Sequence, residues 1–455
     1  MDKSAPAVPT GVPADVVHIL ERLWTKGHAA FLVGGGIRDR LLGRPVHDWD
    51  VATDARPERT LELFSAGKYK NRFGTVTVGT EPDVVEITTF RRDHQYADHR
   101  RPDMVTFTDS LDEDLARRDF TVNAIAWGRA ADEAAAHWSD PTGGLDDLRA
   151  RTLRAVGDPR VRFDEDALRL LRAARLAAQL DFQIESLTLA AMGDTAATVR
   201  WVSRERIGTE VTRMVAADPP SRAFEILAAT NVLAESLPEL AAQRGVPQDK
   251  VTGHDLWGHS MATVDAAAAV DPGNATLRLA ALLHDIGKPP TFADGHFIGH
   301  DEEGAKMAET MLTRFAYPRH EVEHVSDLIR HHMFSYEPRW SGAAVRRFIR
   351  RVGRDLVHDL VKLRRADNLG SGLPDNAGHL DELARRVDAE LAAGAPLTLR
   401  ELAVNGNDLI SGLGIPPGRQ VGQLLERLLG SVIADPSRNT RERLLAEAKI
   451  WTARS

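Results

Sequence analysis

The pattern of apolar and polar positions in the first third of the chain predicts a mixed α/β domain. Apolar residues at helical spacing predict a helix over residues 14–26, which Gly27 ends. Short apolar runs and alternating runs predict a further short helix at 37–42 and strands at 29–33, 49–52, 75–79 and 84–89. We therefore expect a sheet with helices within residues 14–151.

The pattern changes after residue 152. Strand signals nearly vanish, and an Ala-, Leu- and Arg-rich helical periodicity continues to the end of the chain. The plausible linkers are the polar stretch 243–253 and the Gly/Pro/Asn-rich stretch 370–378. The sequence thus predicts an α/β head, an all-α neck and body, a histidine-bearing helical domain and a helical tail, over residues 14–151, 152–250, 251–369 and 376–455.

The composition excludes several classes of binding surface and metal site but does not identify the function. The 455 residues carry a formal net charge of −8, which excludes a uniformly basic coat for nucleic acid. There is no cysteine, so disulfides and thiolate metal sites are excluded, and metals must bind carboxylates or some of the 17 histidines. No apolar run approaches the roughly 20 residues of a membrane span. With no signal peptide pattern at the start, we expect a cytoplasmic protein without a membrane partner.

Three consecutive glycines join the first predicted strand to the next helix. Without Cβ atoms, Gly34, Gly35 and Gly36 could bring backbone N–H groups close to a polyphosphate at the helix N-terminus. Arg38, one turn into that helix, could reach a phosphate. A tight turn between strand and helix remains the alternative explanation of the glycines.

Two acids follow at the start of the next predicted strand. Asp48 and Asp50 would point to the same face of the strand and repel each other unless a cation lies between them. Mg²⁺ needs this arrangement. A third acid on a neighbouring strand would complete a two-metal site. We expect Glu86, with Glu81 or Asp83 as substitutes, and a merely solvent-facing Glu86 as the alternative.

The segment VGGGIRDRLLGRPVHDWDVAT resembles the first motif of the class II tRNA nucleotidyltransferases. This family, of CCA-adding enzymes and bacterial poly(A) polymerases, belongs to the polymerase-β-like nucleotidyltransferase superfamily. The resemblance continues through residues 91–103, 117–126, 140–148 and 162–175. It implies that two Mg²⁺ ions on Asp48 and Asp50, with help from Glu86, activate an RNA 3′-hydroxyl for attack on an α-phosphate.

The same resemblance implies the substrates. The partners would be tRNA, CTP and ATP, and the product would be a CCA end added without a nucleic-acid template. A poly(A) polymerase or a partial adder of CC or A stays open. Residues 91–103 resemble the flexible loop of this family, and their presence favours competence in adding A. The oligomeric state is also left open.

The segment RRDFTVNAIA resembles the sugar-recognising motif of the family. Asp119 would accept a hydrogen bond from a ribose 2′-hydroxyl, so that ribonucleotides are preferred. Arg118 and Asn123 would hold the triphosphate or the sugar. On spacing alone, Asp119 could instead cap a helix N-terminus, and the two roles are compatible.

The segment RFDEDALRLLRAAR is predicted to form one helix that acids open. Asp166 and Arg169 are three residues apart and would share a face, where a surface ion pair is worth only tenths of a kcal/mol. The family carries a matching EDxxR motif at 165–169. Asp166 would accept from the amino groups of cytosine and adenine and repel the carbonyls of uracil and guanine, while Arg169 donates to a ring acceptor.

The dipeptide His-Asp at 284–285 ends an apolar helix and precedes a Gly-Lys-Pro break. Together with one upstream histidine and one downstream aspartate, it resembles the HD superfamily of metal-dependent phosphohydrolases. The metal ligands so implied are His259, His284, Asp285 and Asp367. His300 and either His331 or His332 could join them around a divalent metal. An HD domain that hydrolyses RNA 3′-end or nucleotide phosphates, or one that only supports the RNA, stays open.

Local charge indicates where RNA could bind. Residues 149–175 contain eight arginines and four acids, and residues 346–367 contain eight basic residues and three acids. The first stretch lies beside the proposed active site in the sequence, so we expect Arg172 and Arg175 to contact RNA phosphates. Solvated helix faces are the alternative for both stretches.

Overall fold

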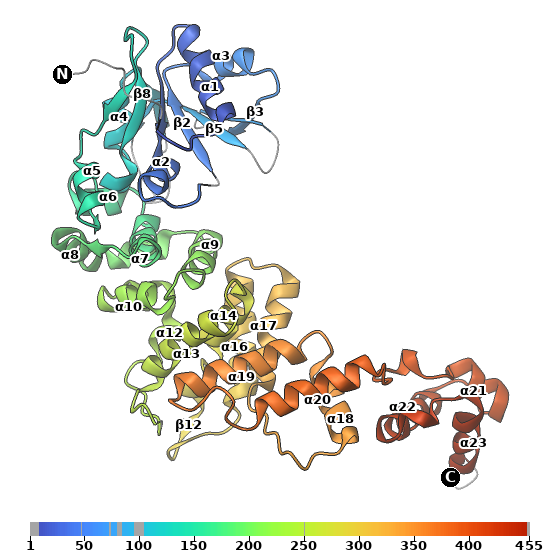
Figure 1. Ribbon diagram of the computed structural model, residues 1–455. Coiled ribbons are helices and arrows are strands. Elements are labelled where there is room, and N and C mark those ends of the chain that lie inside the picture. The colour runs from blue at the N-terminus through green and yellow to red at the C-terminus, as the bar shows by residue number, and fades with distance from the viewer. Residues whose placement is uncertain are drawn as a thin grey trace. The chain divides into compact units, whose positions relative to one another are not determined.

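The computed structural model describes residues 9–46, 48–71, 74–79, 84–94, 104–249 and 251–452 (Figure 1). The chain forms two compact units. One comprises Met1–Asp218 and Arg222–Pro238, and the other comprises Pro219–Ser221 and Glu239–Ser455. No helix among the described residues combines the length and the apolar character needed to cross a membrane.

The first unit is built on a seven-stranded mixed sheet with the order β3-β4-β5-β2-β1-β8-β9. Only β2 and β5 pair in parallel; every other neighbouring pair is antiparallel. The strands are β1 (Ala30–Val33), β2 (Trp49–Thr53), β3 (Lys68–Asn71), β4 (Thr75–Val78), β5 (Val85–Thr89), β8 (Ala126–Arg129) and β9 (His137–Ser139). The four strands predicted from the sequence are confirmed. A separate pair, β6 (Arg91–His94) and β7 (Met104–Phe107), also forms.

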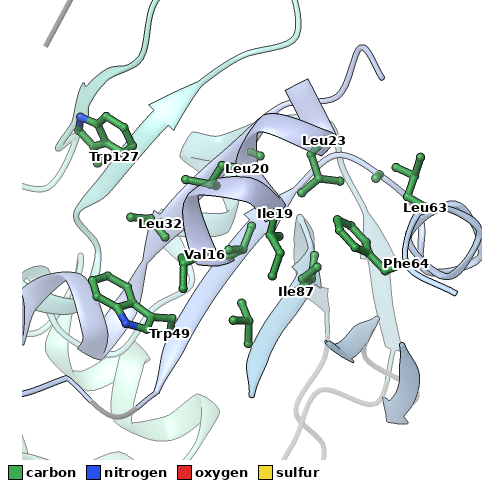
Figure 2. Close-up of a cluster of buried hydrophobic side chains, with 14 of the residues drawn as sticks. Val16, Ile19, Leu20, Leu23, Leu32, Trp49, Leu63, Phe64, Ile87 and Trp127 are labelled. Carbon is green, nitrogen blue, oxygen red and sulfur yellow. The ribbon is translucent and has the colours of Figure 1, made fainter. Parts of the chain in front are cut away.

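Both faces of the central strand β1 are buried, because its four residues are all apolar. In β1, Leu32 faces one core cluster and Phe31 faces the other. Helix α1 (Ala14–Thr25) covers the first face with the side chains Val16, Ile19, Leu20 and Leu23 (Figure 2). Full burial of such a side chain contributes roughly 2 kcal/mol. Helix α3 (Pro57–Leu63) adds Leu63 to the same cluster.

Helix α2 (Gly34–Leu41) differs from the prediction. We expected the glycines to form a connection and the helix to begin at residue 37, but Gly34, Gly35 and Gly36 form its first turn. Gly34 has a φ of +77°, which lets the chain pass from β1 into the helix without an intervening loop. A Cβ at Gly36 would lie 2.7 Å from the carbonyl oxygen of Asp48. Glycine therefore permits close packing of α2 against the start of β2.

The predicted helix over 162–175 is broken in two, which corrects the sequence expectation. Helix α6 (Pro159–Glu165) ends before Asp166, whose backbone is extended (φ −144°, ψ 102°), and α7 (Leu168–Leu180) follows. The Asp166 side chain accepts the backbone N–H of Leu168, a local bond that competes with helix continuation. Asp166 thus precedes α7 instead of lying within a continuous helix.

The remainder of the first unit is almost entirely helical. Helix α7 is buried along most of its length, and α9 packs against it. The elements outside the sheet are α4 (Leu111–Ala116), η1 (Thr121–Asn123), α5 (Gly144–Arg149), β10 (Thr152–Leu153), β11 (Gln183–Ile184), α8 (Ser186–Asp194), η2 (Ala196–Trp201), α9 (Arg204–Val215), α10 (Ser221–Ala229) and α11 (Val232–Ser236).

The second unit is helical, as predicted, apart from one two-stranded hairpin among its described residues, β12 (Phe292–Ala293) and β13 (His296–Phe297). Its first helices are α12 (Pro238–Ala241), α13 (Leu256–Val270), α14 (Ala275–Leu283), α15 (Lys288–Thr291), α16 (His300–Arg314), α17 (Arg319–His331), α18 (Gly342–Val352), α19 (Val357–Gly370) and α20 (Leu380–Ala392). Helices α21 (Gly406–Leu413), α22 (Arg419–Ala434) and α23 (Arg441–Thr452), with η3 (Leu399–Glu401), share a hydrophobic cluster of their own; η4 (Pro436–Arg438) links α22 to α23.

Candidate functional site

Three carboxylates lie together at the N-terminal ends of the interior strands β2 and β5, a place called here the acidic edge. Asp50 of β2 and Glu86 of β5 are direct partners across the parallel pair, so their side chains project from the same face. Asp48 lies two residues before Asp50, directly ahead of the strand, and is exposed. Lys70 of β3 forms an ion pair with Glu86. The alternative third acids, Glu81 and Asp83, lie outside the described residues.

The electrostatics of this edge suit a divalent cation. Burial raises the pKa of Asp50 to about 6, and although Arg118 opposes this rise, the negative charges of Glu86 and Asp48 add to it. A bound cation would relieve both the burial penalty and the repulsion. The donor set is all oxygen, which fits Mg²⁺.

A cavity of about 410 Å³ opens beside Asp50. Its lining is strongly basic, with six arginines and three aspartates, which suits an anionic polyphosphate ligand. The lining residues are Val33, Asp50, Val51, Thr75, Thr88, Arg91, Arg117, Arg118, Asp119, Asp166, Leu168, Arg169, Arg172 and Arg206. Four of the residues predicted to bind nucleotide therefore line one cavity: Arg118, Asp119, Asp166 and Arg169.

Asp119 is held by a buried network. Its Oδ2 accepts two bonds from Arg172, at 2.9 and 2.5 Å, and its Oδ1 accepts from Asn123 Nδ2 at 3.0 Å and from the N–H of Phe120 at 2.8 Å. Burial opposes ionisation of Asp119, yet the Arg172 guanidinium holds the pKa of this carboxyl well below its usual range. Phe120, not Asp119, occupies the N-cap position of the short helix that follows, so the capping alternative is wrong.

Arg38 takes a different position from the one predicted. It is buried, donates to Asn123 Oδ1 at 2.6 Å and pairs with Asp39. It lines a second cavity, of about 400 Å³, and not the cavity beside Asp50. Through Asn123, Arg38 supports the Asp119 network, and the expectation that it reaches a phosphate stays a prediction.

The glycines of α2 leave room for neighbouring side chains of the site, and the binding of a polyphosphate by their backbone stays a prediction. A Cβ at Gly34 would lie 2.8 Å from Oδ2 of Asp50 and 3.3 Å from Nη1 of Arg118. At Gly35 a Cβ would meet only the Arg38 guanidinium, at 3.5 Å or more. Gly34 thus gives the Asp50 carboxylate the room it occupies.

Asp166 and Arg169 line the cavity, but their side chains have different partners. Asp166 Oδ2 accepts from Arg206 at 2.7 Å. Arg169 Nη1 donates to Glu165 at 2.6 Å, and Nη2 donates to the carbonyl of Arg117 at 3.0 Å. Arg206 was not among the predicted site residues, because no local pattern links it to a residue 40 positions earlier.

The two arginines predicted to contact RNA are both engaged within the protein. Arg175 is 8% exposed and donates to Glu210 of α9 at 2.6 Å, so its side chain is not presented to a nucleic acid. This corrects the expectation for Arg175. Arg172 pairs with Asp119 and lines the cavity beside Asp50, and its contact with RNA stays a prediction.

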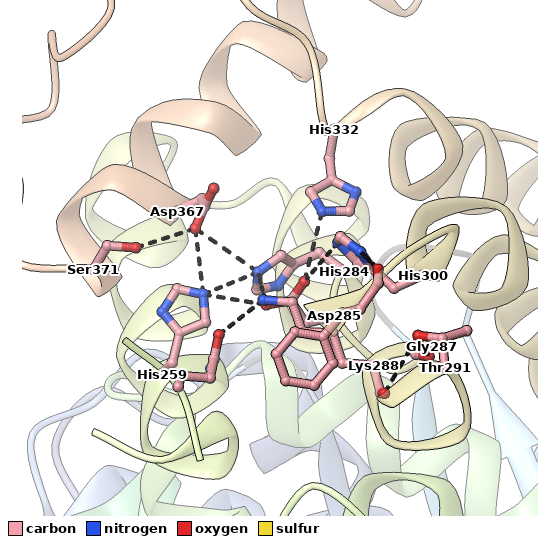
Figure 3. Close-up of polar contacts among 12 residues, drawn as sticks. His259, His284, Asp285, Gly287, Lys288, Thr291, His300, His332, Asp367 and Ser371 are labelled. Carbon is pink, nitrogen blue, oxygen red and sulfur yellow. Dashed lines mark hydrogen bonds and ion pairs between the residues drawn. The ribbon is translucent and has the colours of Figure 1, made fainter. Parts of the chain in front are cut away.

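A second candidate site lies in the second unit, where six titratable side chains point toward one another (Figure 3). They form two groups in which the potential ligand atoms lie within 4.8 Å of one another: His259, His284 and Asp367, and Asp285, His300 and His332. The two groups adjoin, because Asp285 Oδ2 is 3.2 Å from His284 Nε2 and 3.5 Å from His259 Nε2. Of the further histidines considered, His300 and His332 join the cluster and His331 does not.

The helices and the protonation states of this cluster favour metal binding. His259 lies in the first turns of α13, His284 follows α14, and Asp367 lies near the end of α19. Burial lowers the pKa of His284, which favours the neutral imidazole that binds a metal. Burial opposes ionisation of Asp285, but the surrounding histidines hold its pKa well below the usual range.

Three parts of the chain match models of known protein families. Residues 30–154 match the Poly A polymerase head domain, residues 181–244 match the probable RNA and SrmB-binding site of polymerase A, and residues 256–372 match the HD domain. The match to this head domain identifies the chain as a nucleotidyltransferase.

Relatives that match over nearly the whole chain make the family assignment more specific. The CCA-adding enzyme of Geobacillus thermodenitrificans is 33% identical over 94% of both chains, and that of Geobacillus stearothermophilus is 32% identical over 95% of both chains. The crystal structure of the Bacillus stearothermophilus CCA-adding enzyme in complex with CTP superposes with a TM-score of 0.74 at 28% identity, covering 96% of this chain and 97% of that chain. The chain belongs to the family of CCA-adding enzymes.

Proposed function

We propose that this protein adds C and A residues to the 3′ end of tRNA from CTP and ATP, without a nucleic-acid template. The observation that carries the proposal is the pairing of Asp50 with Glu86 across β2 and β5, beside a basic cavity that also contains Asp166. The similar enzyme solved with CTP supports the choice of nucleotide. A tRNA substrate also agrees with the cytoplasmic location that we predict.

The residues of the proposed site would have different chemical roles. Asp48, Asp50 and Glu86 would hold two Mg²⁺ ions, which supply charge neutralisation and lower the pKa of the attacking 3′-hydroxyl. Arg117 and Arg118, on the cavity wall, would attract the triphosphate.

The ribose and the base would meet two different carboxylates. Asp119 already accepts four hydrogen bonds, about the full capacity of a carboxylate. A ribose 2′-hydroxyl would therefore have to replace one of these bonds. Asp166 would accept from the amino group of the base.

The proposal is tested with tRNA that lacks its CCA end. Wild-type protein is incubated with each nucleotide singly and with CTP and ATP together, and the product ends are sequenced. Addition of CCA supports the proposal, whereas long A tails or an arrest at CC would identify the poly(A) polymerase or the partial adder.

An isosteric substitution tests the metal-binding edge. Asp50→Asn should lower the rate of addition at least about 100-fold, because it removes a charge from the position where the reaction is stabilised electrostatically. Glu62→Gln, which alters an exposed carboxylate on α3, is the matched control and should retain the wild-type rate. Substantial addition by folded Asp50→Asn protein would contradict the proposed role.

We propose a second activity for the HD domain: binding of divalent metal and hydrolysis of a phosphate ester. The buried cluster with its two adjoining ligand groups favours this over a purely supporting role. Metal analysis of the purified protein, followed by assays on 2′-phosphates and cyclic nucleotides, tests it. Protein that holds no metal after purification in metal-containing buffer would contradict the proposal.

A further inference from the structure

Two donors hold the Asp166 carboxylate at the break between α6 and α7. Oδ1 accepts the backbone N–H of Leu168 at 3.1 Å, and Oδ2 accepts Nη2 of Arg206 at 2.7 Å. The side chain is 20% exposed and lines the cavity beside Asp50. A carboxylate offers about four acceptor sites, so these two bonds fix its direction and still leave capacity for a ligand.

Arg206 reaches Asp166 from a firmly docked helix. It lies in the first turn of α9, and Glu210, one turn further along the same face, pairs with Arg175 of α7 at 2.6 Å. Glu210 is 2% exposed, so this ion pair is buried between the two helices. The pair fixes α9 against α7 and thereby presents the Arg206 guanidinium at the start of α7.

Arg169 does not replace Arg206 in this contact. Both N–H bonds of its Nη1 are directed away from Asp166, to Glu165 at 2.6 Å and to the carbonyl of Arg162 at 2.8 Å. The guanidinium that contacts the Asp166 carboxylate is that of Arg206. The orientation of the proposed base-reading carboxylate therefore depends on a residue outside the segment that carries it.

We propose that Arg206 is a positioning residue for the choice of nucleobase. By holding Oδ2, it keeps the Asp166 carboxylate oriented to accept an amino group of cytosine or adenine and to oppose a carbonyl of uracil or guanine. A carboxylate held only by the Leu168 N–H can turn about its side-chain torsions. The inference rests on the proposed nucleotide addition and adds to it the residue that sets its selectivity.

The test compares kcat/KM for CTP and for UTP on tRNA that lacks its CCA end. Arg206→Ala should lower the CTP-to-UTP ratio by about tenfold or more, the scale on which one oriented base contact discriminates. Arg206→Lys keeps the charge but not the planar fork, so it should restore part of the ratio. Arg213→Ala, on the same helix with a side chain that is 54% exposed, is the matched control and should keep the wild-type ratio.

A double-mutant cycle separates positioning from general damage. In an Asp166→Ala background, Arg206→Ala should cause no further loss of selectivity, because its effect passes through Asp166. An unchanged ratio in folded Arg206→Ala protein, or an additional loss in the Asp166→Ala background, would overturn the inference. If Arg206→Ala does not fold, an unchanged ratio in Arg206→Met, which removes the donors but keeps a long side chain, does the same. Wild-type protein that adds no nucleotide would instead defeat the proposed function.

Discussion

At the scale of single residues, the surroundings of Gly34 predict that a side chain there would impair both activity and stability. Its φ of +77° and the 2.8 Å between its would-be Cβ and Oδ2 of Asp50 both oppose a side chain. Gly34→Ala should therefore displace the Asp50 carboxylate and lower the rate of nucleotide addition at least about tenfold. The backbone strain should also reduce the free energy of unfolding by about 1–3 kcal/mol.

Gly43 separates these two effects. It lies just after α2 with a φ of +70°, but nothing lies within 4 Å of a Cβ built there. Gly43→Ala should lose similar stability, measured by urea unfolding, yet keep its rate of addition. Equal losses of activity in the two variants would show that strain, and not the contact with Asp50, limits the reaction.

At the scale of elements, the contact between α7 and α9 depends on one buried ion pair. Glu210→Ala leaves the Arg175 guanidinium buried without its carboxylate, at a cost of about 3–5 kcal/mol in the free energy of unfolding. Arg213→Ala removes an exposed partner 3.9 Å from Glu210 and should change that free energy by less than about 0.5 kcal/mol. Urea unfolding of both variants provides the measurement, and similar values for the two would contradict the role of the buried pair.

The same elements show what local sequence can predict. The strands that carry Asp50 and Glu86 were predicted because alternation and apolar runs are local signals. The break before α7 was not, because it depends on an Asp166 side chain that bonds the backbone of Leu168 and is held by a residue 40 positions away. The helical periodicity of residues 162–175 continues across the break and conceals it.

Side-chain direction was the other limit of prediction. The sequence places Arg38, Arg172 and Arg175 on helices beside the proposed site, but it does not say which side chains they contact. Arg38 contacts Asn123 and Asp39. Arg172 pairs with Asp119, and Arg175 pairs with Glu210. The positive charge of residues 149–175 agrees with the basic lining of the cavity, to which this stretch contributes Arg169 and Arg172, whereas Arg175 forms a buried ion pair.

At the scale of the whole molecule, the net charge of −8 conceals two separately organised sites. The acidic edge and its arginine-lined cavity lie entirely within the first compact unit, and the histidine–aspartate cluster lies entirely within the second. No residue is shared between them. The absence of cysteine agrees with both, since one site offers only oxygen ligands and the other adds imidazoles.

This separation predicts that the two activities can be removed one at a time. His284→Ala deletes a ligand from the buried cluster, so the protein should lose bound metal and any phosphate-ester hydrolysis. Its rate of nucleotide addition to tRNA should stay within about twofold of wild type, because the cluster shares no residue with the acidic edge and independent sites couple little. Asp50→Asn should show the reverse pattern, with metal content in the second unit retained. Loss of addition by His284→Ala, in protein whose first unit unfolds at the wild-type urea concentration, would show that the cluster supports the transferase reaction itself.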